Sequence, residues 1–102
     1  MAKLVKIAQT QEVPAGGAIA VEVEDKRIAL FNVGGTFYAI DDLCPHSGGP
    51  LSEGQVAGTI VSCPWHGADF DLATGAVKCP PAEEGVRSYK VVVEGNDLKI
   101  EL

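Results

Sequence analysis

The stretch of sequence that decides the fold reads CPHSGGPL, starting at Cys44, and, after a spacer, CPWHGADF, starting at Cys63. It contains both histidines of the chain and two of its three cysteines. They are spaced as Cys44-x-His46 and Cys63-x-x-His66, with 16 residues between His46 and Cys63. Proline follows each cysteine and glycines come soon after, and these residue types favour tight turns. The pattern predicts a metal site built from two loops, each supplying one thiolate and one imidazole.

The spacing of the ligands bears on which metal is bound. Zinc can be held by two cysteines and two histidines, but zinc fingers usually pair like with like along the chain. Here each loop mixes one cysteine with one histidine, which suits a two-iron cluster with both thiolates on one iron and both imidazoles on the other. The alternatives are a zinc site, a mononuclear iron site, or structural cysteines and surface histidines that lie close together by chance.

The full motif, C-x-H-x16-C-x-x-H with proline after each cysteine and glycine after the second histidine, resembles that of the Rieske [2Fe–2S] proteins. The resemblance covers essentially the whole chain. It implies that Cys44, His46, Cys63 and His66 bind one [2Fe–2S] cluster per chain. It also implies a fold in two parts, with a small cluster-binding lobe set on a β base.

Chain length and composition limit the class of protein. A chain of 102 residues corresponds to one domain, and its N-terminal segment has no long apolar run that would form a signal peptide or membrane anchor. An odd number of cysteines without a leader favours a reducing cytoplasm. Eight basic and 14 acidic residues give a net charge of −6, which disfavours nucleic acid. The charge suits transient docking on a basic partner, and equally an ordinary acidic surface.

Apolar alternation and closely spaced turn signals predict an all-β fold, an antiparallel sandwich or small barrel with almost no helix. Residues 9–17 are expected to form a loop and residues 51–58 a turn-rich segment. Turns are expected at Asp25-Lys26 and at Gly34-Gly35, the latter a hairpin signal. Residues 86–93 are predicted to form the longest uninterrupted strand. The expected strands are 3–7, 18–24, 27–33, 36–41, 59–62, 68–72, 76–78, 86–93 and 97–102.

The metal stretch lies between the early and the late strands. We therefore expect a single domain over 1–102, with the cluster-binding lobe at about 42–82 and the base formed by 1–41 and 83–102.

The resemblance also bears on the redox potential. High-potential members of the family carry a serine and a tyrosine after the second histidine, where this chain has Ala68 and Phe70. They also carry two cysteines that bond the loops together, where this chain has Gly49 and Trp65. Each missing hydroxyl that forfeits about 1 kcal/mol lowers the potential by roughly 40 mV. We expect a value near the bottom of the Rieske range of about −150 to +300 mV.

A small chain of low potential resembles the Rieske ferredoxins of bacterial oxygenase systems. The resemblance implies a one-electron carrier, itself no catalyst, between an NAD(P)H-dependent flavin reductase and a terminal oxygenase of the aromatic-ring dioxygenase type. Docking is expected near His46, His66 and Trp65, with the carrier a monomer; Trp65 itself is either an aromatic docking contact or a lid over the cluster. The alternatives are a Rieske small subunit of a larger enzyme, such as an assimilatory nitrite reductase, and a zinc-binding interaction module.

Several other residues have two interpretations. Cys79 lies in a proline-rich turn and is expected to be a partly buried free thiol, because it would be a fifth ligand in a site that needs four. Asp69 and Asp71 are expected in turns and at strand edges. Four acidic residues form either an acidic docking face around the cluster or a plain solvated surface: Asp42, Glu53, Glu83 and Glu84.

Overall fold

The computed structural model describes residues 3–42, 50–64, 69–79 and 85–101 of the chain. Nearly all of its regular structure is β, and the helices in these ranges are two single 3₁₀ turns. The elements in chain order are β1 (Leu4–Gln9), η1 (Thr10–Glu12), β2 (Ala18–Val23), β3 (Lys26–Val33), β4 (Thr36–Asp41), η2 (Leu51–Glu53), β5 (Gln55–Ala57), β6 (Ile60–Ser62), β7 (Asp69–Asp71), β8 (Val77–Cys79), β9 (Ser88–Tyr89), β10 (Val91–Glu94) and β11 (Asp97–Glu101).

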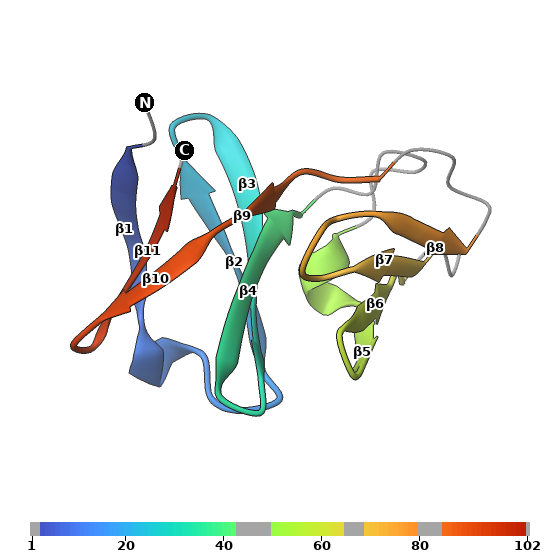
Figure 1. The fold of residues 1–102 in the computed structure, drawn as a ribbon, viewed down its shortest axis with the longest axis horizontal. Coiled ribbons are helices and arrows are strands. Elements are labelled where there is room, and N and C mark those ends of the chain that lie inside the picture. The colour runs from blue at the N-terminus through green and yellow to red at the C-terminus, as the bar shows by residue number, and fades with distance from the viewer. Residues whose placement is uncertain (1–2, 43–49, 65–68, 80–84, 102) are drawn as a thin grey trace.

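The strands form three antiparallel sheets, and the predicted all-β class is confirmed. The outer sheet has the order β1-β11-β10, the central sheet β2-β3-β4-β9 and the lobe sheet β5-β6-β7-β8. Figure 1 shows the central sheet between the other two, with the outer sheet on one side and the lobe sheet with η2 on the other. We call the outer and central sheets the base, and η2 with the lobe sheet the lobe.

The central sheet grows from two hairpins around β3. Glu24 and Asp25 make the first turn with φ of 47° and 70°, so the turn begins one residue before the predicted Asp25-Lys26, and Lys26 pairs with Val23 in the ladder. Gly34-Gly35 makes the predicted second turn, with φ of 59° and 96°. Two central residues with positive φ match the right-handed twist of a tight hairpin. Local turn chemistry therefore sets the register of this sheet.

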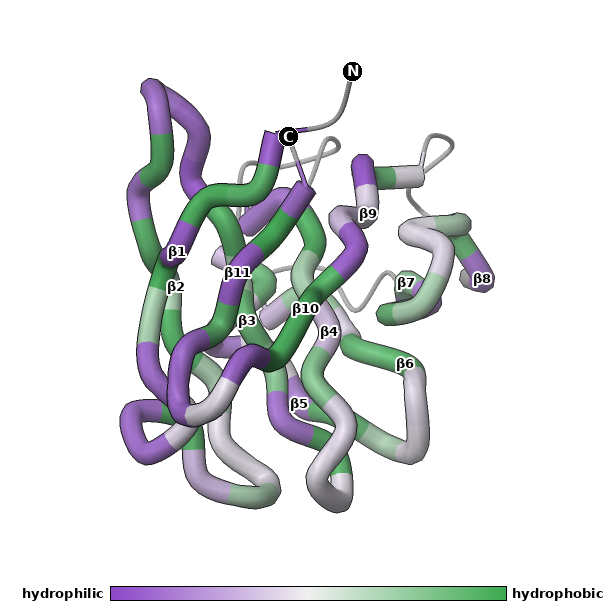
Figure 2. Tube along the Cα trace, turned by 60° about the vertical axis from the view of Figure 1, so that its left-hand side comes forward, coloured by the Kyte–Doolittle hydropathy of each residue, from purple (hydrophilic) through white to green (hydrophobic). Residues whose placement is uncertain are grey.

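Side chains of β3 alternate between two cores, as the period of a strand requires. Ile28 and Leu30 face the outer sheet, while Ala29 and Phe31 face the lobe. The outer sheet covers its side through alternate residues of β11, and Figure 2 shows hydrophilic and hydrophobic residues alternating along that strand. The central sheet is thus buried on both faces, which explains the run of five consecutive buried residues in β3.

The longest strand was predicted in the wrong place. Residues 86–93 form two short strands in different sheets, β9 beside β4 and β10 beside β11, and the longest described strand is β3 with eight residues. The chain changes sheets at Lys90, whose carbonyl oxygen accepts a hydrogen bond from the Glu101 amide at 3.1 Å. An apolar run can continue through such a crossing because both sheets bury the same core.

The lobe sheet consists of strands of three residues each. Its first strand, β5, lies in the segment expected to be only turn-rich. A Cβ on Gly54 would lie 2.1 Å from the Ser62 carbonyl oxygen, so only glycine permits this approach of η2 to β6. Close backbone contacts therefore hold the lobe together, because its strands are too short to form long ladders of hydrogen bonds.

None of the helices in the described ranges has the length and apolar character needed to cross a bilayer.

Candidate metal centre

Of the four predicted ligands, Cys63 lies in the described part of the chain. Cys44, His46 and His66 lie outside it, as does Trp65 of the predicted docking site. Consequently, within residues 3–42, 50–64, 69–79 and 85–101, no three His, Cys, Asp or Glu side chains come together as a metal site. The structure therefore bears on the site through Cys63 and through the residues that flank the three other segments.

Cys63 directly follows β6 and is 2% exposed. It belongs to a core, which we call the lobe core, that includes Leu51, Val61, Phe70 and Phe31 of the base. The same cysteine also lines a surface hollow together with Glu53, Gln55, Ser62 and Pro64. Its sulfur is thus held by apolar packing at the boundary between the core and the surface. Leu51 is fully buried in this core.

The first ligand segment is anchored at both ends. The Leu51 amide donates a hydrogen bond of 2.5 Å to the Asp42 carbonyl oxygen, and the Ser52 amide donates one of 2.7 Å to the Asp42 carboxylate. Asp42 and Leu51, which lie on either side of the segment that contains Cys44 and His46, are therefore held together.

Two further segments, residues 65–68 with His66 and residues 80–84, adjoin the same end of the lobe sheet. Ser62 pairs with Asp69 across β6 and β7, and its hydroxyl donates a 2.5 Å hydrogen bond to the Asp69 carboxylate. Asp69 in turn pairs with Cys79, the last residue of β8. Gly54 lies against Ser62, so η2 reaches this end as well. The sequence positions of all four predicted ligands thus adjoin one end of the lobe.

This arrangement fits a cluster held between loops. Cys63 is buried and directly precedes Pro64 and the segment that contains His66, and soft sulfur with imidazole nitrogen is the donor set of a His-ligated [2Fe–2S] centre. The anchoring bonds hold the ends of the loops independently of any ligand.

Asp42 corrects one expectation. It was expected on an exposed surface, yet it is 0% exposed, and both of its carboxylate oxygens are hydrogen-bonded. The Arg27 guanidinium donates to Oδ2 at 2.5 Å, and the Ser52 amide donates to Oδ1. Asp42 is not part of a recognisable motif. Its burial could have been predicted from the alternation along β4, because Asp42 lies on the same face as Tyr38 and Ile40. Glu53 is exposed as expected, and Glu83 and Glu84 lie outside the described residues.

The neighbouring Asp41 serves the base. It accepts a 2.7 Å hydrogen bond from the Tyr89 hydroxyl and a 3.3 Å bond from the Arg87 amide. Burial, followed by the hydrogen bond to Asp41, raises the pKa of Tyr89 to about 12. The Lys26 ammonium lies 6.0 Å from the centre of the Tyr89 ring. Adjacent carboxylates thus have different tasks: Asp41 holds β9 on the central sheet, and Asp42 holds the lobe.

Asp69 and Asp71 have the local roles expected of them. Asp69 accepts the Ser62 hydroxyl, and the Asp71 carboxylate accepts the amides of Ala73 at 2.8 Å and Thr74 at 3.2 Å. Asp69 therefore supports the end of the β6–β7 pair, and Asp71 supports the turn that follows β7. For Cys79 the structure gives only its place at the end of β8, and its thiol state stays a prediction.

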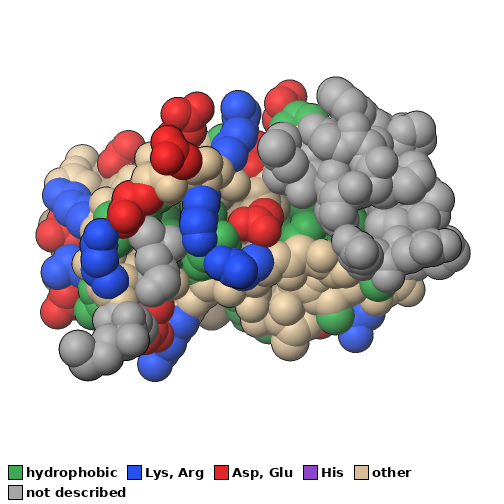
Figure 3. Space-filling view, turned by 90° about the horizontal axis from the view of Figure 1, so that it is seen from above, with side chains coloured by type: hydrophobic (Ala, Val, Ile, Leu, Met, Phe, Trp, Pro, Cys, Tyr) green, Lys and Arg blue, Asp and Glu red, His purple; other side chains and the backbone are tan. Residues whose placement is uncertain are grey.

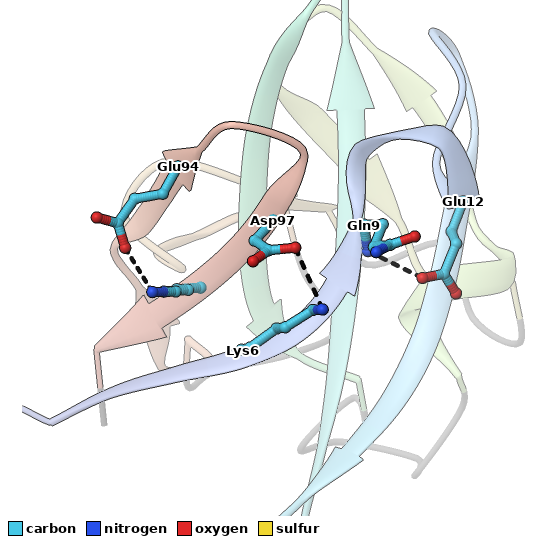
Figure 4. A network of polar contacts seen from close by, with 6 residues as sticks. Lys6, Gln9, Glu12, Glu94 and Asp97 are labelled. Atoms are coloured by element: carbon cyan, nitrogen blue, oxygen red, sulfur yellow. Dashed lines mark hydrogen bonds and ion pairs between the residues drawn. The ribbon is translucent and has the colours of Figure 1, made fainter.

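Polar contacts on the outer sheet have no connection to this end of the lobe. Figure 4 shows Lys6 paired with Asp97 at 3.2 Å, and the Gln9 amide donating to Glu12 at 2.9 Å at the start of η1. Lys99 pairs with Glu94 at 2.5 Å, and this contact raises the pKa of Lys99. Such exposed pairs each contribute about 0–1 kcal/mol. Figure 3 shows acidic and basic side chains interspersed over one face of the base.

Known proteins resemble the chain over nearly its whole length. Residues 3–90 match the family described as Rieske [2Fe-2S] domain. The chain is 46% identical over 92 residues to the 3-phenylpropionate/cinnamic acid dioxygenase ferredoxin subunit of Shigella boydii, covering 89% of this chain and 86% of that protein. It is 38% identical over 91 residues to the ferredoxin component of the naphthalene 1,2-dioxygenase system of Pseudomonas aeruginosa, covering 89% and 88%.

Solved structures resemble the whole fold. The ferredoxin of carbazole 1,9a-dioxygenase from Nocardioides aromaticivorans IC177 superposes with a TM-score of 0.90 at 30% identity, covering 96% of each chain. A chain in a complex of reduced oxygenase and oxidized ferredoxin in carbazole 1,9a-dioxygenase superposes with a TM-score of 0.87 at 28% identity, covering 95% of this chain and 91% of that one.

Proposed function

The chain belongs to the Rieske [2Fe–2S] domain family, and we propose that it carries single electrons to the terminal oxygenase of a ring-hydroxylating dioxygenase system. The observation that carries this proposal is 46% identity to a dioxygenase ferredoxin subunit of nearly equal length. The similarity covers 89% of this chain and 86% of that ferredoxin subunit. Both relatives described above are ferredoxins, which favours this role over that of a nitrite reductase small subunit.

We propose Cys44, His46, Cys63 and His66 as the ligands, within a single domain over 1–102. Support comes from the motif and from the burial of Cys63 beside the ends of the other segments. When bound, the cluster supplies reversible one-electron chemistry. Two neutral imidazoles in place of two thiolates make the added electron less unfavourable. The chain's own residues hold the loops: Asp42 anchors the first, and the Ser62–Asp69 pair anchors the second.

Partners follow from the relatives. A solved complex pairs a ferredoxin similar to this chain with its oxygenase. We propose that a terminal oxygenase and a flavin-dependent NAD(P)H reductase dock in turn near His46, His66 and Trp65. Acidic and basic groups are interspersed on the base in Figure 3, so the net charge of −6 assists approach without defining one acidic face there. A monomeric state and a cytoplasmic location are proposals of the same kind.

The first test is EPR of the purified chain after reduction with dithionite, with iron and sulfide counted on the same sample. We expect two irons and two sulfides per chain and a rhombic signal of a His-ligated cluster, with a potential in the lower part of about −150 to +300 mV. A colourless protein that contains zinc and no sulfide would disprove the proposal.

The ligand set is tested with a matched pair of cysteine variants. Cys63→Ala removes a proposed ligand, so we expect loss of the cluster and of its visible absorption. Cys79→Ala removes the cysteine outside the motif, so iron content and EPR spectrum are expected to match those of the wild type. Loss of the cluster in both variants would reassign the ligands.

The carrier role is tested by turnover. The chain is added to a reconstituted naphthalene 1,2-dioxygenase system from which the ferredoxin has been omitted, and the dihydroxylated product is measured. We expect product that depends on this chain and on its cluster. An intact cluster with no transfer to this or any other ring-hydroxylating oxygenase would contradict the carrier role while leaving the cofactor in place.

A further inference from the structure

The ion pair between Arg27 and Asp42 lies on the lobe-facing side of the central sheet. Ala29 and Phe31 of β3 and Ile40 of β4 belong to the lobe core, and alternation places residues 27 and 42 on that same face. The pair is asymmetric: the Arg27 side chain is 47% exposed, whereas that of Asp42 is 0% exposed. A surface cation therefore compensates a carboxylate that has no access to water.

Asp42 also uses its backbone groups at this junction. Its amide donates a 2.9 Å hydrogen bond to the Arg27 carbonyl oxygen, and its own carbonyl accepts the Leu51 amide. The Asp42 carboxylate also accepts the Arg27 guanidinium and the Ser52 amide, so these contacts join the end of β4, the start of β3 and η2. Asp42 thus fixes both ends of the segment that contains Cys44 and His46.

We propose that the Arg27–Asp42 pair is a positioning and charge-balancing element for the metal centre, a role that rests on the proposed ligand set. Asp42 holds the first ligand loop, and Arg27 cancels the negative charge that this buried carboxylate adds two residues before Cys44. Reduction adds one negative charge to the centre. A buried and uncompensated carboxylate nearby would oppose that step, because charges interact strongly away from water.

Charge balance predicts opposite effects for the two partners. Arg27→Gln leaves the carboxylate uncompensated, so the reduction potential falls. Asp42→Asn removes the negative charge while its Oδ1 can still accept the Ser52 amide, so the potential rises. The double variant removes both charges and returns the potential towards that of the wild type. A purely structural role would shift both single variants in the same direction, through a loosened loop.

The chain offers a matched control one residue away. Asp41→Asn removes the same charge from the last residue of β4, but Asp41 bonds to Tyr89 and Arg87 and not to η2. We expect Asp41→Asn to leave the EPR g values and the rate of iron loss at wild-type values and to shift the potential less than Asp42→Asn does. Arg27→Lys keeps the positive charge and is expected to restore most of the wild-type potential.

The experiment is redox titration of the purified holoprotein and its five variants, read by EPR, with iron loss to a chelator timed on the same samples. Opposite shifts for Arg27→Gln and Asp42→Asn, with cancellation in the double variant, support the proposal. Shifts in the same direction, or equal effects of Asp41→Asn and Asp42→Asn, overturn it while leaving the carrier function intact. A wild-type protein without the cluster overturns both.

Discussion

The base and the lobe are built by different means from the same chain. Strands of the base reach eight residues, and its ladders are continuous between β2, β3 and β4. Strands of the lobe have three residues, and their pairing is supported by side-chain bonds such as Ser62–Asp69 and by glycines where backbones approach closely. The base therefore holds itself through repeated hydrogen bonding and apolar burial, whereas the lobe depends on a few specific contacts.

The two cores show the same difference. The core between the outer and central sheets, which we call the base core, draws all its buried residues from the base, including Ile28, Leu30, Leu98 and Ile100. The lobe core takes Ala29, Phe31 and Ile40 from the central sheet. Among the described residues, the lobe thus shares its core with the central sheet, and its order is set by that sheet on one side and, in our proposal, by the metal centre on the other.

Removing the metal should give the largest difference between the two regions. In apoprotein prepared by acid treatment and chelation, we expect amide hydrogen-exchange protection to be lost across β5–β8 and retained in β2, β3 and β4. The reason is that three-residue strands have little cooperative pairing of their own. Equal protection of both regions in the apoprotein, or unfolding of the whole chain at once, would show that the lobe and base form one cooperative unit.

Two leucines, one in each core, test which packing supports the metal. Leu51 and Leu98 are both 0% exposed, so Leu51→Ala and Leu98→Ala should each lower the free energy of unfolding by about 2–5 kcal/mol in urea titrations. We expect only Leu51→Ala to accelerate loss of the visible absorption under native conditions, because Leu51 belongs to the same core as Cys63. Equal rates of bleaching in the two variants would count against separate cores.

A glycine pair tests the close contacts of the lobe. Gly75 has φ of +79°, and a Cβ there would lie 1.9 Å from the Val86 carbonyl oxygen. Gly58 has φ of +61° and open space around it. We expect Gly75→Ala to cost about 3 kcal/mol, from the left-handed backbone and the clash, and Gly58→Ala about 1 kcal/mol, from the backbone alone, in denaturant titrations. Similar losses would mean that segment 85–86 moves away without cost.

The smallest effect concerns the base and its pH dependence. Burial and the bond to Asp41 raise the pKa of Tyr89 from its ordinary value of 10.0 to about 12, so neutral Tyr89 stabilises the folded state. This contribution is complete below pH 10 and is lost as the pH rises from 10 to 12, amounting to about 3 kcal/mol. Tyr89→Phe should lose about 1 kcal/mol at pH 8 and show a flatter decline above pH 10. Identical pH profiles for the two proteins would exclude Tyr89 as the cause.

Sequence reasoning worked best where local signals decide the structure. Alternation and turn residues located β2, β3 and β4 within about one residue, because each hairpin is specified by the residues at its own turn. It failed at residues 86–93, where one apolar run serves two sheets, and at β5, where the short strand lies in a glycine-rich stretch. In both places pairing partners distant in sequence decide the strand.

The same division applies to the site. The sequence by itself determined the ligand motif, the cofactor and the class of protein, because a cluster demands certain donor atoms at certain spacings and these are visible as residue types. Tertiary structure alone decided that Asp42 is buried against Arg27, and that the ends of the loops meet at one end of the lobe. Burial and charge compensation depend on which strands stack face to face, and that packing is a property of the whole chain.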